Sequence, residues 1–483
     1  MRIKASYIAT GITLVLLVLL NMSCKKNRQL TVGGVLKFST DTLKFDTVFT
    51  SAGSFTSGIV IYNPQNEEVT VSSVRLHEGT ASYFHLNVNG YTGNVVTNLK
   101  IPAHDSIYVF ATVNIDPNDK RTPFVITDSL VATLNGNEFY LPMTAYGQNA
   151  HYIVNALLVG NHVWDTLLPY VIINSAEVGP GSTLTINPGC KIYMHQNSGL
   201  IVEGKLFING TAKDTVIFQG DRLDRAYFDY KGYPGEWGGI YFGSHSNGNK
   251  MSYTRLKNCG NSALGGFAAA IWVTPDSVNY NNPSAIPQLQ MDHCIIENSI
   301  GYGILSFQGS VVATNCLVHT TGAEALVITK GGYDSFVNCT FANYGSYAVS
   351  HSNYHTVGIL NYFQVSIDSF LYGDLNAVMK NCIVYGSLDS EIICDASDKA
   401  AASLRLDHCL LRMGDVREPF IQITNCLFNQ DPQFKDAKNF DFHLTSGSPA
   451  IDAGAGTTLT DDLDNKPRPQ QGGVDIGCYE YQP

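Results

Sequence analysis

The sequence predicts an all-β protein that consists of a β-sandwich, a parallel β-helix (a solenoid) and a C-terminal cap. Three observations lead to this fold class. A short cysteine-containing phrase recurs at a spacing of 22 or 23 residues, residues 34–148 alternate between polar and apolar, and 44 glycines supply many turns. At 483 residues the chain is also too long for one ordinary domain.

The recurring phrase is a polar residue, a cysteine and then apolar residues. A fixed period in the low twenties is typical of a solenoid, in which each coil buries its apolar face against its neighbours. The copies are centred on Cys259, Cys294, Cys316, Cys339, Cys382, Cys409 and Cys426.

The repeats are predicted to form strands rather than helices. Their apolar runs are short, rich in Val, Ile, Phe and Thr, and bounded by Gly and Asn. Two or three such strands per coil make a parallel β-helix. The seven cysteines should then stack as one internal column of reduced, buried side chains. The Asn or His before each cysteine should lie at a bend, which makes His293 and His408 turn residues.

Residues 1–23 have the pattern of a signal peptide. Arg2 and Lys4 precede a 13-residue apolar run that is too short to span a bilayer. The run is followed by Ser23-Cys24, which resembles a bacterial lipoprotein signal. The resemblance implies cleavage before Cys24, lipidation of its thiol, and a tether over residues 24–33. The alternative is an ordinary signal peptide with an incidental cysteine.

A lipidated Cys24 would place the protein in the cell envelope, anchored to the outer membrane. In Bacteroidetes-type lipoproteins, acidic residues after the cysteine resemble a surface-export signal. Here Lys25, Lys26 and Arg28 are basic, so periplasmic and surface-facing orientations stay open. Without residues 1–23 the formal net charge falls from −11 to −13. This acidity argues against nucleic acid as a partner.

Residues 34–148 are predicted to form the β-sandwich. Alternation is clearest over residues 106–115, and turn signals such as Asn89-Gly90 and Asn135-Gly136 separate about seven short strands. Tyr62-Asn63-Pro64 and the following apolar strand resemble Ig-like domains of the abnormal-spindle and Hydin type. That resemblance implies a spacer or an interaction domain.

Residues 149–430 are predicted to form the solenoid. The stretches 181–190, 199–211 and 234–242 resemble the opening coils of pectate-lyase-like, right-handed parallel β-helix proteins of bacterial envelopes. Residues 150–176 are the expected cap over the first coil, because an exposed solenoid end would aggregate. Two stretches, 273–290 and 351–378, break the period. Each stretch is predicted to be a loop that projects from one coil. The alternative for the second stretch is an additional coil that lacks the cysteine.

Residues 431–483 are similar to the choice-of-anchor Q type C-terminal region of secreted bacterial β-helix proteins. The matching motifs are Phe442–Gly454, Asp461–Asp464, Arg468-Pro469 and Asp475–Glu480, with Cys478 where the family usually has Ala. We expect the charged residues to pair and close the last coil. Asp461, Asp462 and Asp464 could alternatively form a calcium site. No other cofactor or metal is predicted.

The best candidate for ligand binding is a loop with both charge signs and several aromatic residues. Aromatic faces stack on sugar rings, and Asp and Arg side chains bind hydroxyl groups. The alternative is a solvated loop folded over a coil. The candidate residues are Asp221, Arg222, Asp224, Arg225, Tyr227, Asp229, Tyr230, Lys231, Tyr233, Glu236 and Trp237.

Two further features are weaker candidates. The aromatic stretch 354–372 is a second possible binding segment, and His351 and His355 are a possible metal-binding or acid–base pair.

The sequence favours binding over catalysis. Glycoside hydrolases need two carboxylates that face one groove, and polysaccharide lyases need a base beside a uronate. Neither set of motifs is recognisable. The first hypothesis is therefore a non-catalytic binding or scaffold protein with a polysaccharide as possible partner. The alternative is a polysaccharide lyase or glycoside hydrolase, which rests on analogy of fold.

Overall fold

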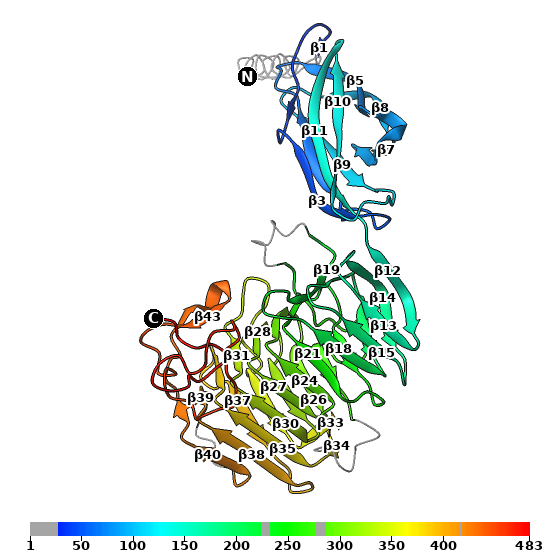
Figure 1. The fold of residues 1–483 in the computed structure, drawn as a ribbon. Coiled ribbons are helices and arrows are strands. Elements are labelled where there is room, and N and C mark those ends of the chain that lie inside the picture. The colour runs from blue at the N-terminus through cyan, green and yellow to red at the C-terminus, as the bar shows by residue number, and fades with distance from the viewer. Residues whose placement is uncertain (1–27, 224–231, 276–285, 415–417) are drawn as a thin grey trace, which may run out of the picture. The chain divides into compact units, whose positions relative to one another are not determined.

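The computed structural model describes residues 28–223, 232–275, 286–414 and 418–483. These residues form two compact units that divide between Asn149 and Ala150 and are described separately below (Figure 1). Both units are built from strands, as the sequence predicts.

The first unit is a sandwich of two mainly antiparallel sheets. On β9, Ile107, Val109 and Ala111 are buried while Tyr108 and Phe110 are exposed, which is the expected period-2 alternation. One sheet contains β1 (Gln29–Leu30), β5 (Glu68–Leu76), β8 (Val95–Ile101), β10 (Phe124–Leu134), β11 (Asn137–Gln148) and β3 (Leu43–Phe49). The other contains β2 (Lys37–Phe38), β4 (Ser57–Tyr62), β9 (Ser106–Val113), β6 (Phe84–Val88) and β7 (Tyr91–Thr92), and the 3₁₀ turn η1 is Gly79–Ala81.

The second unit is a parallel β-helix with three columns of strands. Column A is a ten-stranded sheet, and an 18-stranded sheet divides into columns B and C because β14 pairs with both β16 and β17. Column A contains β13 (Asn161–Trp164), β15 (Thr183–Ile186), β18 (Lys205–Asn209), β21 (Asn249–Ser252), β24 (Leu289–Asp292), β27 (Val311–Thr314), β30 (Gly332–Val337), β35 (Leu375–Lys380), β38 (Ala402–Asp407) and β40 (Ile421–Thr424).

Each coil passes through column A, then column B, then column C (Figure 1). Column B contains β16 (Lys191–Met194), β19 (Val216–Gly220), β22 (Thr254–Lys257), β25 (Ile295–Ser299), β28 (Leu317–Thr321), β31 (Thr340–Asn343), β36 (Ile383–Gly386), β39 (Leu410–Leu411) and β41 (Leu427–Phe428). Column C contains β17 (Gly199–Val202), β20 (Ile240–Phe242), β23 (Ala269–Val273), β26 (Tyr302–Phe307), β29 (Leu326–Thr329), β32 (Val357–Leu360) and β37 (Ile392–Asp395).

The corner between columns A and B explains the recurring phrase. The residue before each cysteine has a positive φ there, including His293 (51°) and His408 (49°), so the predicted turn role is confirmed. Asn and His tolerate this left-handed conformation better than most residues. The cysteine that follows points inward. Cys294, Cys316, Cys339, Cys382, Cys409 and Cys426 form one stacked column in which successive thiols are in contact.

One cysteine was placed wrongly by the sequence pattern. Cys259 follows β22 and lies at the corner between columns B and C, not between A and B. Asn258 before it also has a positive φ, of 59°, which makes the two corners look alike in sequence. In this coil Tyr253 (φ 41°) and Thr254 take the positions that Asn and Cys occupy elsewhere.

Residues 150–176 are not a separate cap, contrary to the expectation. They belong to the solenoid itself, because β12 (His151–Leu158) pairs in parallel along the length of β14 (Tyr170–Val178) in the next coil, and β13 pairs with β15. Trp164 and Tyr170 stack at 4.4 Å within this stretch.

The long gap between Cys339 and Cys382 contains no hidden coil. β30 pairs directly with β35, and β31 with β36, so both belong to adjacent coils. The extra residues form a loop at 344–356 and a hairpin of β33 (Tyr362–Ser366) and β34 (Ser369–Tyr372). The insertion is therefore a pair of excursions from one coil.

The C-terminal segment (residues 431–483) does not close the last coil. It contains β42 (Phe434–Asp436), η3 (Ala437–Asn439) and β43 (Asp441–Leu444), and it folds back beside column B (Figure 1). Leu463 and Tyr479 pack against Leu317. In the last coil, Ile423 and Phe428 remain 43% and 39% exposed. The expected pairing of charges does occur, since Arg468 binds Glu480 at 2.7 Å, but it fixes the segment to the side of the solenoid.

The corner asparagines hold this segment. The side-chain amide of Asn338 donates to the carbonyl groups of Asp475 (3.1 Å) and Gly477 (3.3 Å), and that of Asn381 donates to Ala455 (2.8 Å). The strands of column B pair their main-chain groups with neighbouring coils, so side-chain amides such as these supply polar attachment for the segment.

Replacing Asn338 by Ala should weaken the attachment by about 1–3 kcal/mol. The change leaves the buried carbonyl groups of Asp475 and Gly477 without this donor, and it places alanine in a left-handed backbone conformation that alanine tolerates poorly. The measurement is the rate of native-state proteolysis within the C-terminal segment. Asn425→Ala is the matched control, because Asn425 has the same backbone strain (φ 47°) but bonds His408 instead. Equal proteolysis rates in the two variants would contradict the assignment.

The carboxyl group of Asp334 is buried inside the solenoid. Asp334 on β30 accepts hydrogen bonds from Ser306 Oγ (2.9 Å) and Val311 N (3.0 Å) through Oδ1, while Oδ2 is buried without a partner in the described chain. Burial raises the pKa of Asp334 to about 7, from an ordinary value of 3.8. The folded protein therefore holds a proton here that the unfolded chain loses.

This raised pKa predicts a pH-dependent loss of stability. The stabilising protonated state is fully present below about pH 4, and its contribution is lost as the pH rises to about 7. Asp334→Asn should be more stable than the wild type by about 1–3 kcal/mol at pH 8, with the difference vanishing towards pH 4. Urea unfolding followed by tryptophan fluorescence reports on the solenoid, because all three tryptophans lie in it. A difference that does not depend on pH would refute the prediction.

Candidate functional site

The loop that the sequence singled out is only partly described. Asp224, Arg225, Tyr227, Asp229, Tyr230 and Lys231 lie outside the described residues. Arg222 is exposed, the carboxylate of Asp221 lies 2.6 Å from His195 Nδ1, and Glu236 accepts a hydrogen bond from Tyr233 N (3.1 Å).

The expected role of Trp237 is wrong. Its side chain is fully buried in the solenoid core, where it stacks on Phe218 and donates from Nε1 to the carbonyl of Lys257 (2.8 Å). An indole in this position fills the core and is closed to a sugar. A tryptophan beside two glycines resembles a loop in sequence, and only the coil stacking shows that it points inward.

A partly buried aromatic surface lies on the outer side of column C. Strand register places Tyr241 beside Trp272, with ring centroids 4.7 Å apart. Phe363 of the hairpin contacts Phe267 at 5.6 Å and Phe307 at 5.1 Å. We name these five side chains the aromatic surface.

The aromatic surface is supported from below and flanked by charge. Leu305 and Val327 of column C are buried beneath it, and Lys330 Nζ lies 5.4 Å from the ring of Phe307. The stretch 354–372 contributes Phe363, as the sequence suggested. The other four rings come from three successive coils, so only the register of the parallel strands could identify them.

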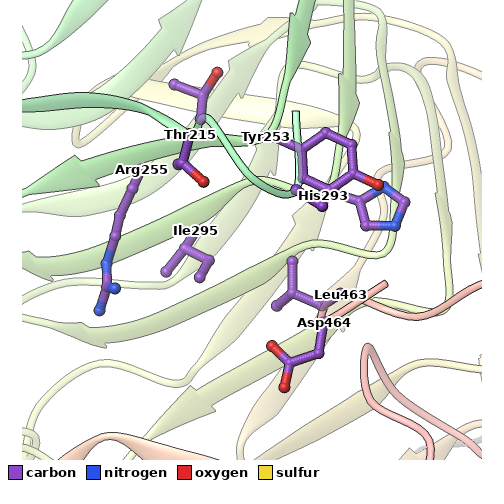
Figure 2. Close-up of a pocket in the computed structure, with 9 residues that line it drawn as sticks. Thr215, Tyr253, Arg255, His293, Ile295, Leu463 and Asp464 are labelled. Atoms are coloured by element: carbon purple, nitrogen blue, oxygen red, sulfur yellow. The ribbon is translucent and has the colours of Figure 1, made fainter. Parts of the chain in front are cut away.

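A polar pocket lies between column B and the C-terminal segment (Figure 2). Its volume is about 180 Å³. Its walls come from the 212–215 turn, the A–B corner, two strands of column B and the C-terminal segment. The lining residues are Ala212, Thr215, Tyr253, Thr254, Arg255, His293, Ile295, Leu463 and Asp464.

The ring of His293 stacks on Tyr253 at 4.3 Å, and its nitrogens lie 2.9 Å from Asp292 and 3.6 Å from Asp461. Burial opposes the protonation of His293, but these carboxylates outweigh it and raise its pKa. Burial, with the negative charge of Asp461, raises the pKa of Tyr253 to about 12. The imidazole of His293 is thus more easily protonated than a free imidazole, and the phenol of Tyr253 stays protonated.

A buried carboxylate orients the arginine of the pocket. Glu297 lies 2.6 Å from Arg255 and 3.3 Å from Lys257, with His319 at 3.6 Å. Burial opposes the ionisation of Glu297, but His319 and the two cations outweigh it and hold its pKa well below its ordinary value. Glu297 is therefore a fixed negative charge beneath the pocket.

The two histidines suggested as a pair have separate partners. His351 Nε2 contacts the buried carboxylate of Glu391 at 2.9 Å, which also accepts from Thr356 Oγ1 (2.7 Å). His355 Nδ1 lies 2.8 Å from the carbonyl of Ser390. Each ring is positioned by a neighbouring coil.

The three aspartates of the possible calcium site also face different partners. Asp462 accepts main-chain hydrogen bonds from Lys466 and Glu480, whereas Asp464 faces His443 and Asp461 faces His293. In the described ranges no group of three or more His, Cys, Asp or Glu side chains is arranged to hold a metal ion.

Cys24 lies outside the described residues. Among the residues that the structure describes, no helix has the length and apolar character needed to cross a membrane.

The fold defines a parallel β-helix preceded by a β-sandwich. No family model and no curated protein matches the chain. Two solved structures show partial likeness. A family 123 glycoside hydrolase from Clostridium perfringens is 12% identical over 23% of this chain and 25% of its own, with a TM-score of 0.17. The ASH/PapD-like domain 7 of human CEP192 is 12% identical over 26% of this chain and 92% of its own, also with a TM-score of 0.17. TM-scores this low have no bearing on the activity of this chain.

Proposed function

We propose that this protein is a lipid-anchored component of the cell envelope that binds a polysaccharide without cleaving it. The observation that carries the proposal is the aromatic surface, which gathers five partly buried rings from four separate segments. Two excursions from the coils, the 260–268 loop and the β33–β34 hairpin, supply Phe267 and Phe363. Aromatic faces on a rigid scaffold suit the C–H faces of successive sugar rings.

The titratable groups in the polar pocket and beside the aromatic surface favour binding over cleavage. Asp464 is the one carboxylate that lines the described pocket, whereas a glycoside hydrolase uses two. At the hairpin, Tyr362 donates to Asp395 (2.7 Å), and burial together with this bond raises its pKa to about 12. A lyase that used Tyr253 or Tyr362 as its base would need a much lower pKa.

The proposed anchor rests on the N-terminal sequence. The apolar run, Ser23-Cys24 and the following tether support lipidation at Cys24 and attachment to the outer membrane. Radiolabelled palmitate incorporation into the wild type but not into Cys24→Ser tests it. Equal incorporation would refute the anchor and leave the binding proposal untouched.

The binding proposal is tested with residues 25–483 and a panel of plant, algal and host polysaccharides. Affinity gel electrophoresis measures binding, while ultraviolet absorbance and reducing-end assays measure cleavage. We expect retardation by at least one neutral polysaccharide and no product. Product from any substrate, or no retardation by any polysaccharide, would overturn the proposal.

Variants locate the binding to the aromatic surface. Phe363→Ala should weaken retardation by about tenfold or more, because it removes a central ring of the cluster. Tyr347→Ala is the matched control, since Tyr347 is a fully exposed aromatic residue of the same unit outside the aromatic surface. Equal loss in both variants would contradict this location.

A further inference from the structure

We propose that the polar pocket is a second binding site, separate from the aromatic surface, and that it takes a single uncharged, hydroxyl-rich ring such as one sugar unit. The pocket is built by the solenoid and the C-terminal segment together.

The size of the pocket limits its ligand. Its volume of about 180 Å³ is below the roughly 300–1,000 Å³ of pockets for drug-sized ligands. One ring fits such a space, whereas a run of polymer does not. Ile295 and Leu463 supply apolar contacts for the C–H groups of that ring.

An unused donor points to an oxygen-bearing ligand. Arg255 is fixed by Glu297, which accepts from Nη2 at 2.6 Å. Its Nε atom is buried and has no hydrogen-bond partner among the described residues. That atom is closed to solvent, but Arg255 lines the pocket and its side chain stays 40% exposed, so the guanidinium group can donate to a ligand hydroxyl oxygen.

An acceptor lies on another wall of the pocket. Asp464 uses Oδ2 to bind His443 Nε2 (2.9 Å), and its side chain stays 48% exposed. Figure 2 shows Arg255 and Asp464 on opposite sides of Ile295, with Thr215 above them. A donor, an acceptor and a hydroxyl group thus surround one small space.

The charges around this space select against ions. Asp464 lines it, and Asp292 and Asp461 lie behind His293, so an anionic ligand meets three carboxylates. A cationic ligand meets the guanidinium group of Arg255. Hydroxyl groups both donate and accept, so an uncharged polyol satisfies Arg255 and Asp464 without repulsion.

The test is a titration of residues 25–483 with monosaccharides, in which isothermal calorimetry and saturation-transfer NMR measure binding. The probes are glucose, galactose, mannose and rhamnose, with glucuronate and glucosamine as charged analogues. We expect saturable millimolar binding of at least one neutral sugar and at least fivefold weaker binding of both charged sugars. No saturable binding up to about 50 mM, or preference for a charged sugar, would overturn the proposal.

Two variants place the binding in the pocket. Asp464→Asn and Thr215→Val should each weaken it at least fivefold, while Asp398→Asn, an exposed site on another coil, should not. Thr215 lies on the solenoid, so Thr215→Val keeps the test valid if Asp464→Asn loosens the C-terminal segment. Unchanged affinity in Thr215→Val would refute the site.

The two binding proposals can be refuted independently of each other. Phe363→Ala should weaken polysaccharide retardation about tenfold or more and leave monosaccharide affinity unchanged, whereas Thr215→Val should weaken monosaccharide binding at least fivefold and leave retardation unchanged. Loss of both activities in either variant would show that the pocket is not a separate site.

Discussion

Arg468→Met is expected to release the C-terminal segment from the solenoid at a cost of about 3–5 kcal/mol. Arg468 and Glu480 are both almost fully buried, and their charged atoms lie 2.7 Å apart. The guanidinium group also donates to the carbonyls of Asp475 (3.1 Å) and Gly477 (3.2 Å). Methionine fills similar space but leaves the Glu480 carboxylate buried and unpaired.

Native-state proteolysis of the segment and urea unfolding measure this effect. Lys435→Met is the control within the same segment, because Lys435 is 67% exposed where it pairs with Asp441 at 3.2 Å. Exposed pairs contribute about 0–1 kcal/mol, so the control should resemble the wild type. Arg468→Met with wild-type protease resistance would show that the ion pair does not hold the segment.

Trp237→Ala is expected to destabilise the solenoid by about 3–5 kcal/mol, because it empties the largest fully buried side-chain site in the described core. It also removes the hydrogen bond to the Lys257 carbonyl. The loss should appear as a lower urea midpoint in tryptophan fluorescence, which Trp164 and Trp272 still report.

Tyr233→Ala is the control for this prediction. Tyr233 belongs to the same loop but is 55% exposed, so its replacement should change stability by about 0.5 kcal/mol or less. If Trp237→Ala kept wild-type stability and lost polysaccharide binding, the sugar-stacking role first expected for this loop would be restored.

The repeating phrase predicted the solenoid well because its physical causes are local. A left-handed corner accepts Asn or His, and a small thiol fits the interior behind it, so the same two residue types return in each coil. Cys259 shows the limit of the pattern. The B–C corner of its coil needs the same left-handed residue, and only Gly260-Asn261, in place of the apolar residues after the other cysteines, sets this copy apart.

The candidate sites were less predictable. The composition of the loop at 221–237 predicts a binding segment, yet its tryptophan, Trp237, is buried in the solenoid core. The aromatic surface depends on which residues share a register position, as with Tyr241 and Trp272, which are 31 positions apart. Arg255 and Asp464 line the same polar pocket although they are more than 200 positions apart in the sequence.

The sequence by itself determined the all-β class, the coil period and the corner residues, because each depends on contacts within one coil or between successive coils. Tertiary structure alone decided where the C-terminal segment lies. Its charges can pair with one another at the end of the solenoid or along its side, and composition does not distinguish the two. The corner amides of Asn338 and Asn381 and the apolar outer face of column B decide it, because they offer partners that the last coil lacks.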